Sequence, residues 1–170
     1  MKFLKYSLLI LLIPFVFACG DDEDPVSQTY QNLLGVWDSK EIALSLSVDN
    51  QPITEYWIEE LGLTEVEAEF LLELAGQSLA AEFTGTIEFK ADNTYEAKFG
   101  ADTETGSWEL IKSDQFILLT TGGDVEEIEI VSVTSANLVV RFSDEGSSDL
   151  AGDGSGENVE AVIELTLEKN

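Results

Sequence analysis

The sequence has no histidine and a single cysteine, Cys19, among its 170 residues. Without histidine the chain cannot form Ser-His-Asp or Cys-His triads, or zinc sites with histidine ligands. A glycine-rich phosphate loop followed by lysine is also missing. One cysteine cannot form a disulfide within the chain, so a hydrophobic core must hold the fold, and 44% of the residues are hydrophobic. We therefore expect a non-enzymatic protein without a cofactor.

Basic residues are also scarce, because 8 Lys and Arg stand against 34 Asp and Glu, for a formal net charge of −26. Nucleic acids and anionic lipid surfaces are bound through clustered Lys and Arg, so this balance argues against both as partners. The excess of carboxylates favours solubility and permits cation binding, but it does not indicate a fold.

Proline is rare, and none follows Pro52, so no later strand loses a backbone donor. Short runs of alternating apolar and polar residues fill this part of the chain, separated by turn residues such as Asp92-Asn93 and Gly122-Gly123. The runs predict strands at 34–46, 85–90, 94–99, 104–112, 115–121, 125–133, 137–143 and 159–168. Tight turns make successive strands antiparallel neighbours. We therefore predict an all-β fold, an eight-stranded up-and-down antiparallel barrel.

The alternation also assigns the two faces of each strand. Tyr95, Ala97 and Phe99 fall on one side of their strand, with Glu96 and Lys98 on the other. One apolar and one polar face are what an antiparallel sheet around a core requires. A barrel of eight strands is either filled by its inward side chains or holds one small ligand. Here, aromatic residues alternate with small ones, and the sequence leaves both possibilities open.

The N-terminal segment carries Lys2 and Lys5, then an apolar run from Leu8 to Ala18 that is too short for an ordinary membrane span. It ends in Val16-Phe17-Ala18-Cys19, which resembles the lipobox of bacterial lipoproteins; an ordinary secretory signal is the alternative. The resemblance implies a signal peptide at 1–18 and lipidation of Cys19 by fatty acids such as palmitate. The acids that follow Cys19 resemble the export signal of Bacteroidetes surface lipoproteins. Residues 19–32 then form an acidic tether, anchored at the outer membrane and exposed on the cell surface.

Three short motifs follow in order: Gly35-Val36-Trp37, the segment Phe89 to Tyr95, and Gly106-Ser107-Trp108. Their order resembles the lipocalin-like lipoproteins of Bacteroidetes, in which a Gly-x-Trp strand opens the barrel and its tryptophan closes one end. The resemblance implies a lipocalin-like barrel domain over residues 33–170.

Residues 53–82 depart from the strand pattern and predict a helical insert between the first and second strands. Thr64 and Glu67 fit a capping box at the start of the longer helix. An apolar stripe at helical spacing is expected to pack into the core: Val66, Phe70, Leu71, Leu74, Ala75 and Leu79. We expect this insert to cap one mouth of the barrel. The alternative is a lid over the cavity, with Trp57 facing the ligand.

The loop at 144–160 is rich in glycine, serine and acids. Asp149, Asp153 and Glu160 match a calcium loop only in part, because Ala151 stands where an oxygen ligand is required and helices do not flank the segment. We expect a solvated connection here rather than a metal site.

These observations favour a surface-anchored barrel that binds a small apolar or amphipathic ligand, or a glycan. Inward or lid aromatics would form the pocket: Trp37, Trp57, Phe89, Tyr95, Phe99 and Trp108. The alternative is a filled barrel that serves as an accessory or protein-interaction subunit of an outer-membrane assembly. A third possibility is a small inhibitor or immunity-like protein.

Overall fold

The computed structural model describes residues 26–148, 150 and 156–170. Its strands are β1 (Gly35–Val48), β2 (Gln51–Pro52), β3 (Gly85–Phe89), β4 (Thr94–Phe99), β5 (Asp102–Ile111), β6 (Phe116–Thr121), β7 (Asp124–Val133), β8 (Asn137–Ser148) and β9 (Glu157–Lys169). Its helices are α1 (Gln28–Leu33), α2 (Ile53–Leu61) and α3 (Glu65–Glu82). None of these described helices has both the length and the apolar character needed to cross a membrane. The predicted signal peptide and Cys19 lie outside the described residues.

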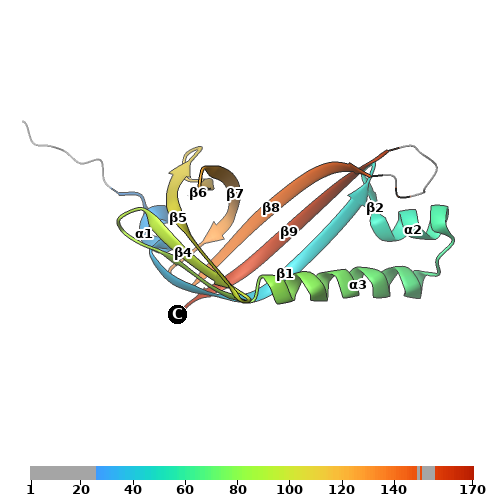
Figure 1. Ribbon diagram of the computed structural model, residues 1–170, viewed down its shortest axis with the longest axis horizontal. Helices are drawn as coiled ribbons and strands as arrows, with labels where there is room; N and C mark the ends of the chain where they lie inside the picture. Colours follow the sequence, from blue (N-terminus) through green and yellow to red (C-terminus); the bar gives the residue numbers. More distant parts are fainter. Residues whose placement is uncertain (1–25, 149, 151–155) are drawn as a thin grey trace, which may run out of the picture.

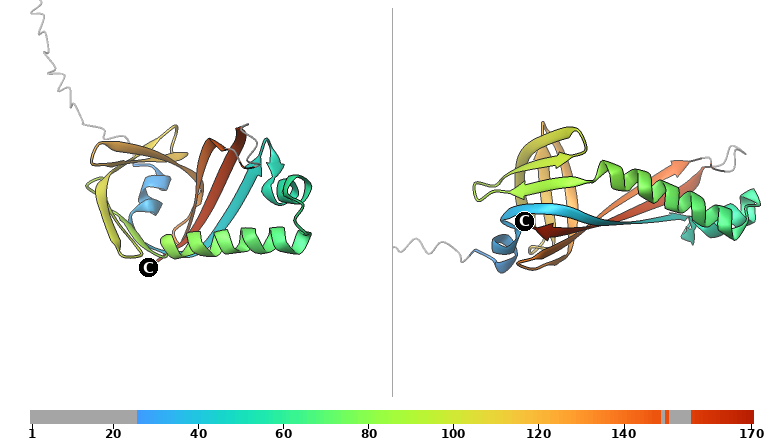
Figure 2. Two further views of the ribbon diagram at one scale, coloured as in Figure 1. Left: turned by 45° about the vertical axis from the view of Figure 1, so that its right-hand side comes forward. Right: turned by 90° about the horizontal axis from the view of Figure 1, so that it is seen from below.

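Eight of the strands close into a barrel (Figures 1 and 2). From β1 and β3 through to β9 each strand pairs with the next in antiparallel order, and β9 pairs back onto β1. The short β2 lies outside this ring and pairs only with the end of β1. The predicted eight-stranded up-and-down antiparallel barrel is therefore confirmed, and so is the helical insert between its first and second strands.

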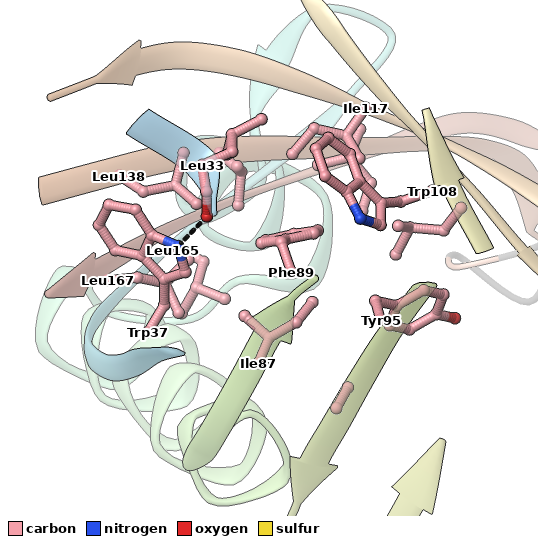
Figure 3. Close-up of a cluster of buried hydrophobic side chains, with 14 residues drawn as sticks. Leu33, Trp37, Ile87, Phe89, Tyr95, Trp108, Ile117, Leu138, Leu165 and Leu167 are labelled. Carbon is pink, nitrogen blue, oxygen red and sulfur yellow. Dashed lines mark hydrogen bonds between the residues drawn. The ribbon is translucent and has the colours of Figure 1, made fainter. Parts of the chain in front are cut away.

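The barrel core comes from the alternating inward positions that the sequence predicts. Across the β3–β4 pair, Ile87 lies opposite Ala97 and Phe89 opposite Tyr95, so the apolar sides of both strands meet on the same face. All four are buried, and Figure 3 shows Ile87, Phe89 and Tyr95 among the core side chains. Because side chains alternate along a strand, this register places the apolar side chains of both strands in the barrel interior.

Three strands of the same sheet continue beyond the closed barrel. We call residues 43–48 of β1, 142–148 of β8 and 157–163 of β9 the arm (Figure 1). β8 loses its β7 partner after Arg141, but its pairing with β9 runs on to Ser148. The sequence predicts a loop over residues 144–148, because glycine, serine and acids have low strand propensity. Pairing with β9 overrides that propensity.

The helical insert lies along the arm instead of across the barrel mouth (Figure 2). Ile53 and Tyr56 of α2 pack against Val48 of β1 in a small second core, which Trp57 and Leu72 complete. The expected cap over the mouth is therefore wrong. The physical reason is that the arm presents a second apolar sheet face, and α2 and α3 cover it.

The expected orientation of α3 is also wrong. Its Thr64–Glu67 capping box is present, but the residue of this helix that is fully buried is Ala68, and Leu72, one turn further on, packs against the second core. Val66, Phe70, Leu71 and Leu74 face outward and are exposed. Two apolar lines of comparable length run along α3, and periodicity alone could not tell which one faces the sheet.

Part of the segment assigned to the tether is structured. Ser27 caps helix α1 by accepting a hydrogen bond from the Tyr30 backbone N–H at 3.1 Å, and Leu33 at the end of the helix is fully buried in the barrel core. The left view of Figure 2 shows α1 within the outline of the barrel. Residues 28–32 therefore belong to the folded domain, because α1 supplies the apolar surface that closes one end of the barrel.

Candidate ligand-binding cavity

Trp37 of β1 is at the centre of the closed end. Its indole N–H donates to the carbonyl of Leu33 at 2.7 Å, so it ties α1 to the barrel (Figure 3). The Lys169 ammonium lies 4.9 Å from the Trp37 ring centre and donates to the Asn32 carbonyl at 2.7 Å. Gly35 has a φ of +121°, and a Cβ there would lie 2.9 Å from the Lys169 side chain. This explains the glycine of the first Gly-x-Trp motif.

Trp108 of β5 forms the other half of the closed end. Its indole N–H donates to the Lys90 carbonyl at 3.2 Å, and Tyr30 of α1 stacks on its ring with centres 5.0 Å apart. Phe89 meets it edge-on at 5.3 Å. At Gly106 a Cβ would lie 2.1 Å from the Thr120 carbonyl oxygen, so the second Gly-x-Trp motif also requires glycine. The two tryptophans are buried structural residues that form a floor.

Above this floor the barrel encloses a cavity of about 230 Å³. Its wall is mainly apolar and comes from the inward positions of β3 to β9. The wall residues that are buried are Ile87, Phe89, Tyr95, Ala97, Ile117, Leu119, Ile128, Leu138, Val140, Leu165 and Leu167. Three partly buried phenylalanines, Phe83, Phe99 and Phe142, lie close together beside it, with ring centres 5.9 Å apart for both Phe83–Phe99 and Phe83–Phe142. The barrel is therefore not completely filled.

The open end of the cavity is acidic. Asp102 and Glu104 of β5 and Glu126 of β7 line it and are exposed to solvent. An adjoining hollow of about 190 Å³ shares Glu104 and Glu126 with the cavity and adds Asp124. Among the described residues that line either space there is no Lys or Arg. The mouth therefore presents negative charge without an internal counter-ion.

One hydrogen-bonded group links the apolar wall to this mouth. The Tyr95 hydroxyl donates to the Glu104 carboxylate and also contacts the Thr121 hydroxyl, which donates to Glu104 at 2.8 Å. Burial, together with the hydrogen bond to Glu104, raises the pKa of Tyr95 to about 12, so the phenol stays protonated and remains a donor. Burial and the nearby Glu104 carboxylate raise the pKa of Glu126 above its ordinary value.

The structure divides the predicted site aromatics into three groups. Phe89, Tyr95 and Phe99 line the cavity. Trp37 and Trp108 instead form the floor beneath it. Trp57 lies in the second core on the arm and is absent from the cavity lining, so the lid interpretation of that residue is wrong.

Sequence reasoning did not identify the acidic mouth, although the signal was present. Glu104 has the same strand parity as the inward Trp108, and Glu126 has the parity of the buried Ile128. Both carboxylates lie near strand ends, beyond the apolar positions that define the inward face, so the alternation of apolar and polar residues did not assign them to the barrel interior. Phe83 was missed because it follows a helix and precedes the first residue of β3.

The partial calcium motif has only one described residue. Asp149 and Asp153 lie outside the described residues, whereas Glu160 lies on β9 and accepts a hydrogen bond from the Ser47 hydroxyl at 3.3 Å. In the part of the chain that the structure describes, no three acidic or sulfur ligands gather into a group able to hold a metal ion.

Fold and cavity together define a hollow eight-stranded antiparallel barrel with an apolar interior and an acidic mouth. Scans against protein-family models and curated proteins found no match. Among the solved structures that match is the crystal structure of a DUF4847 family protein from Bacteroides vulgatus. It shares 13% sequence identity with a TM-score of 0.41, and the match covers 81% of this chain and 94% of that one.

Proposed function

We propose that this protein is a lipid-anchored, non-enzymatic binding protein of the bacterial outer membrane, and that its barrel holds a small amphipathic ligand with a cationic head group. The observation that carries the proposal is the pairing of a mainly apolar cavity with a mouth of carboxylates and no basic residue among its described lining. Ligand sites commonly combine an apolar wall with a few polar groups that fix orientation.

The size of the cavity limits the apolar part of the ligand. A dry cavity of roughly 150 Å³ holds benzene, so by proportion about 230 Å³ suits a tail of about eight or nine carbon atoms. A glycan fits less well, because the apolar wall would leave most of its hydroxyls without hydrogen-bond partners.

The charge of the mouth selects the head group. An ammonium group would lie beside Glu104 and Glu126 and gain charge-assisted hydrogen bonds. A fatty acid of the same length would bring a fourth carboxylate to a mouth that already holds three, and it would be repelled.

The anchor part of the proposal rests on the lipobox resemblance, and the fold is consistent with it. The first described residue, Val26, precedes α1 at the closed end of the barrel, whereas the cavity mouth lies at the other end of the strands. Six residues lie between Cys19 and Val26, and the seven Cα-to-Cα steps that join them span at most about 25 Å. A membrane-bound Cys19 would keep the floor near the lipid and leave the mouth facing away.

The test compares octylamine, octanol and octanoate by isothermal titration calorimetry on a chain that begins at Gly20 and so retains every described residue. We expect the amine to bind most tightly and the acid least tightly. Ala97→Phe places a ring in the cavity and should weaken all binding by about tenfold or more. Glu109→Gln, on the exposed outer side of β5, is the matched control and should change nothing.

The outcomes separate the parts of the proposal. If octanol and octylamine bind equally, the cavity binds ligands but the head-group assignment is wrong. If no eight-carbon ligand binds, or Ala97→Phe leaves binding unchanged, the cavity is not the site. The anchor is tested separately, because Cys19→Ala should abolish incorporation of radiolabelled palmitate in the cells that make the protein.

A further inference from the structure

The outer face of α3 carries a line of large apolar side chains in solvent. Val66, Phe70 and Leu74 are 75%, 61% and 49% exposed. They stand four residues apart, so they form one continuous strip along the helix, which we call the outer strip. The inner face of the same helix buries Ala68. A helix selected only for stability would bury its large side chains and expose the small ones, so the outer strip calls for a different explanation.

The charges around this strip are all of one sign. Glu65, Glu69 and Glu73 run along one flank of α3 at four-residue spacing, where like charges repel each other. The sequence has no Lys or Arg anywhere between Lys40 and Lys90, a stretch that includes both α2 and α3.

The parts of the arm that come from β8 and β9 also lack basic residues, because no Lys or Arg lies between Arg141 and Lys169. The described ion pairs use cations that lie outside these two stretches: Lys40, Lys90, Lys98, Lys112 and Arg141. In the described residues, no acid of α2 or α3 forms an ion pair with Lys or Arg.

We propose that the outer strip of α3 is a docking surface for a partner protein that presents an apolar helix or groove bordered by Lys and Arg. Protein interfaces commonly place apolar residues at the centre and charged residues at the rim. Opposite charge on the partner would remove the repulsion along the Glu65–Glu69–Glu73 flank and would set orientation and association rate. Apolar anchors spaced four residues apart on a helix are a known recognition pattern.

The same charges argue against two other occupants. A second copy of the chain would bring one wholly acidic flank against another. An anionic lipid surface would be repelled, because such surfaces attract basic segments. The proposal does not depend on the cavity, so the docking surface and the ligand site can fail independently.

The experiment measures fluorescence anisotropy of a synthetic amphipathic helix of roughly 18 residues, with Leu on one face and Lys on the other. A second peptide with Glu in place of Lys is the charge control. Titration uses the chain from Gly20 in about 0.15 M salt, where surface charges more than roughly 8 Å apart are largely screened. We expect the lysine peptide to bind and the glutamate peptide not to bind.

Variants then locate the binding. The triple variant Val66→Gln, Phe70→Gln, Leu74→Gln should weaken binding of the lysine peptide by about tenfold or more. The triple variant Glu65→Gln, Glu69→Gln, Glu73→Gln should weaken it less and reduce its dependence on salt. Val125→Gln and Val131→Gln replace exposed valines on β7 of the barrel and should leave binding unchanged. All substituted side chains are exposed, so circular dichroism should show unchanged folding.

Three results would overturn the proposal. The first is binding that persists in the Val66, Phe70 and Leu74 variant, because attraction to the acidic chain in general would then explain it. The second is a dimer in sedimentation velocity that the same variant abolishes, because the strip would then join two copies. The third is binding to phosphatidylglycerol vesicles that depends on the strip, because the occupant would then be lipid.

Discussion

The barrel and the arm share three strands but differ in what their side chains do. The barrel is closed by pairing on every side, buries its aromatics and forms ion pairs on its outer surface, such as Arg141 with Glu129 and Glu164, both at 3.0 Å. The arm has only acidic charges and a small second core under α2 and α3, and α3 leaves large apolar side chains in solvent. The difference teaches that one continuous sheet can enclose a cavity at one end and, at the other, support helices that leave large apolar side chains exposed.

The largest expected effect lies in the barrel floor. Trp37→Ala removes a fully buried ring and leaves the Leu33 carbonyl without its donor. We expect the free energy of unfolding to fall by about 3–5 kcal/mol, measured by urea denaturation. Loss of protection from hydrogen exchange in α1 should accompany it.

Trp37→Phe is the control for this prediction, because it keeps an aromatic ring but removes the N–H donor. We expect a smaller loss, of about 1–3 kcal/mol, from the unpaired carbonyl and the reduced volume. If Trp37→Ala lowers the free energy of unfolding by less than about 1 kcal/mol, the floor does not stabilise the barrel. The difference in stability that we infer between the barrel and the arm would then be wrong.

In the arm, a core substitution should have a smaller and more local effect. Ile53→Ala opens the small second core between α2 and β1, and we expect a cost of about 2 kcal/mol, at the low end for such changes because this cluster has few members. Hydrogen exchange should increase in α2 and in residues 43–48 while β4 to β6 stay protected. Equal exchange throughout would show that arm and barrel unfold as one unit.

The capping box of α3 should contribute less to the free energy of unfolding than the Ile53 side chain does. The Thr64 hydroxyl accepts from the Glu67 N–H at 3.4 Å, and the Glu67 carboxylate accepts from the Thr64 N–H at 2.9 Å. Thr64→Ala should cost about 1 kcal/mol and fray the first turn of α3. The same hydrogen bonds lower the pKa of Glu67. Thr64→Ser keeps the hydroxyl and should retain wild-type melting temperature.

The smallest effect concerns pH at the cavity mouth. Burial and Glu104 raise the pKa of Glu126, so this carboxylate gains its proton before an ordinary one as pH falls. Octylamine remains charged throughout this range, whereas Glu126 loses its negative charge as the pH drops from 7 toward the ordinary carboxyl pKa of about 4.3. The affinity for octylamine should therefore fall by about a few-fold over this range. Octanol binding should stay constant over the same range. In Glu126→Gln the amine profile should become flatter, and an unchanged slope would assign the titration to another group.

The strands could be predicted from sequence because alternation and turn residues are local signals. Trp37 and Trp108 face inward as predicted, but they lie beneath the cavity instead of lining it, at the end that the Gly-x-Trp resemblance implies for Trp37. Their role depends on α1, whose Tyr30 lies in the segment predicted to be tether and whose Leu33 is the first residue of the predicted barrel domain. A helix of six residues, without a strong apolar period, leaves little trace in a sequence.

The acidic mouth shows a limit of a different kind. The parity of Glu104 and Glu126 was readable, but their proximity was not, because it depends on β5 and β7 flanking β6 around a closed ring. The position of Trp57 shows the same limit. The sequence placed it on a helix and could not say which of two apolar surfaces that helix would cover.

By itself, the sequence determined the β architecture, the order of the strands, the helical insert with its capping box, and the segregation of every basic residue away from the insert. Those features follow from local periodicity, turn chemistry and composition. Only the tertiary structure decided that β1, β8 and β9 extend beyond the barrel, that the insert covers the arm, and that Val66, Phe70 and Leu74 remain in solvent. These outcomes depend on strand lengths and on competition between two apolar helix faces for one sheet, and such competition is settled by packing between residues far apart in the chain.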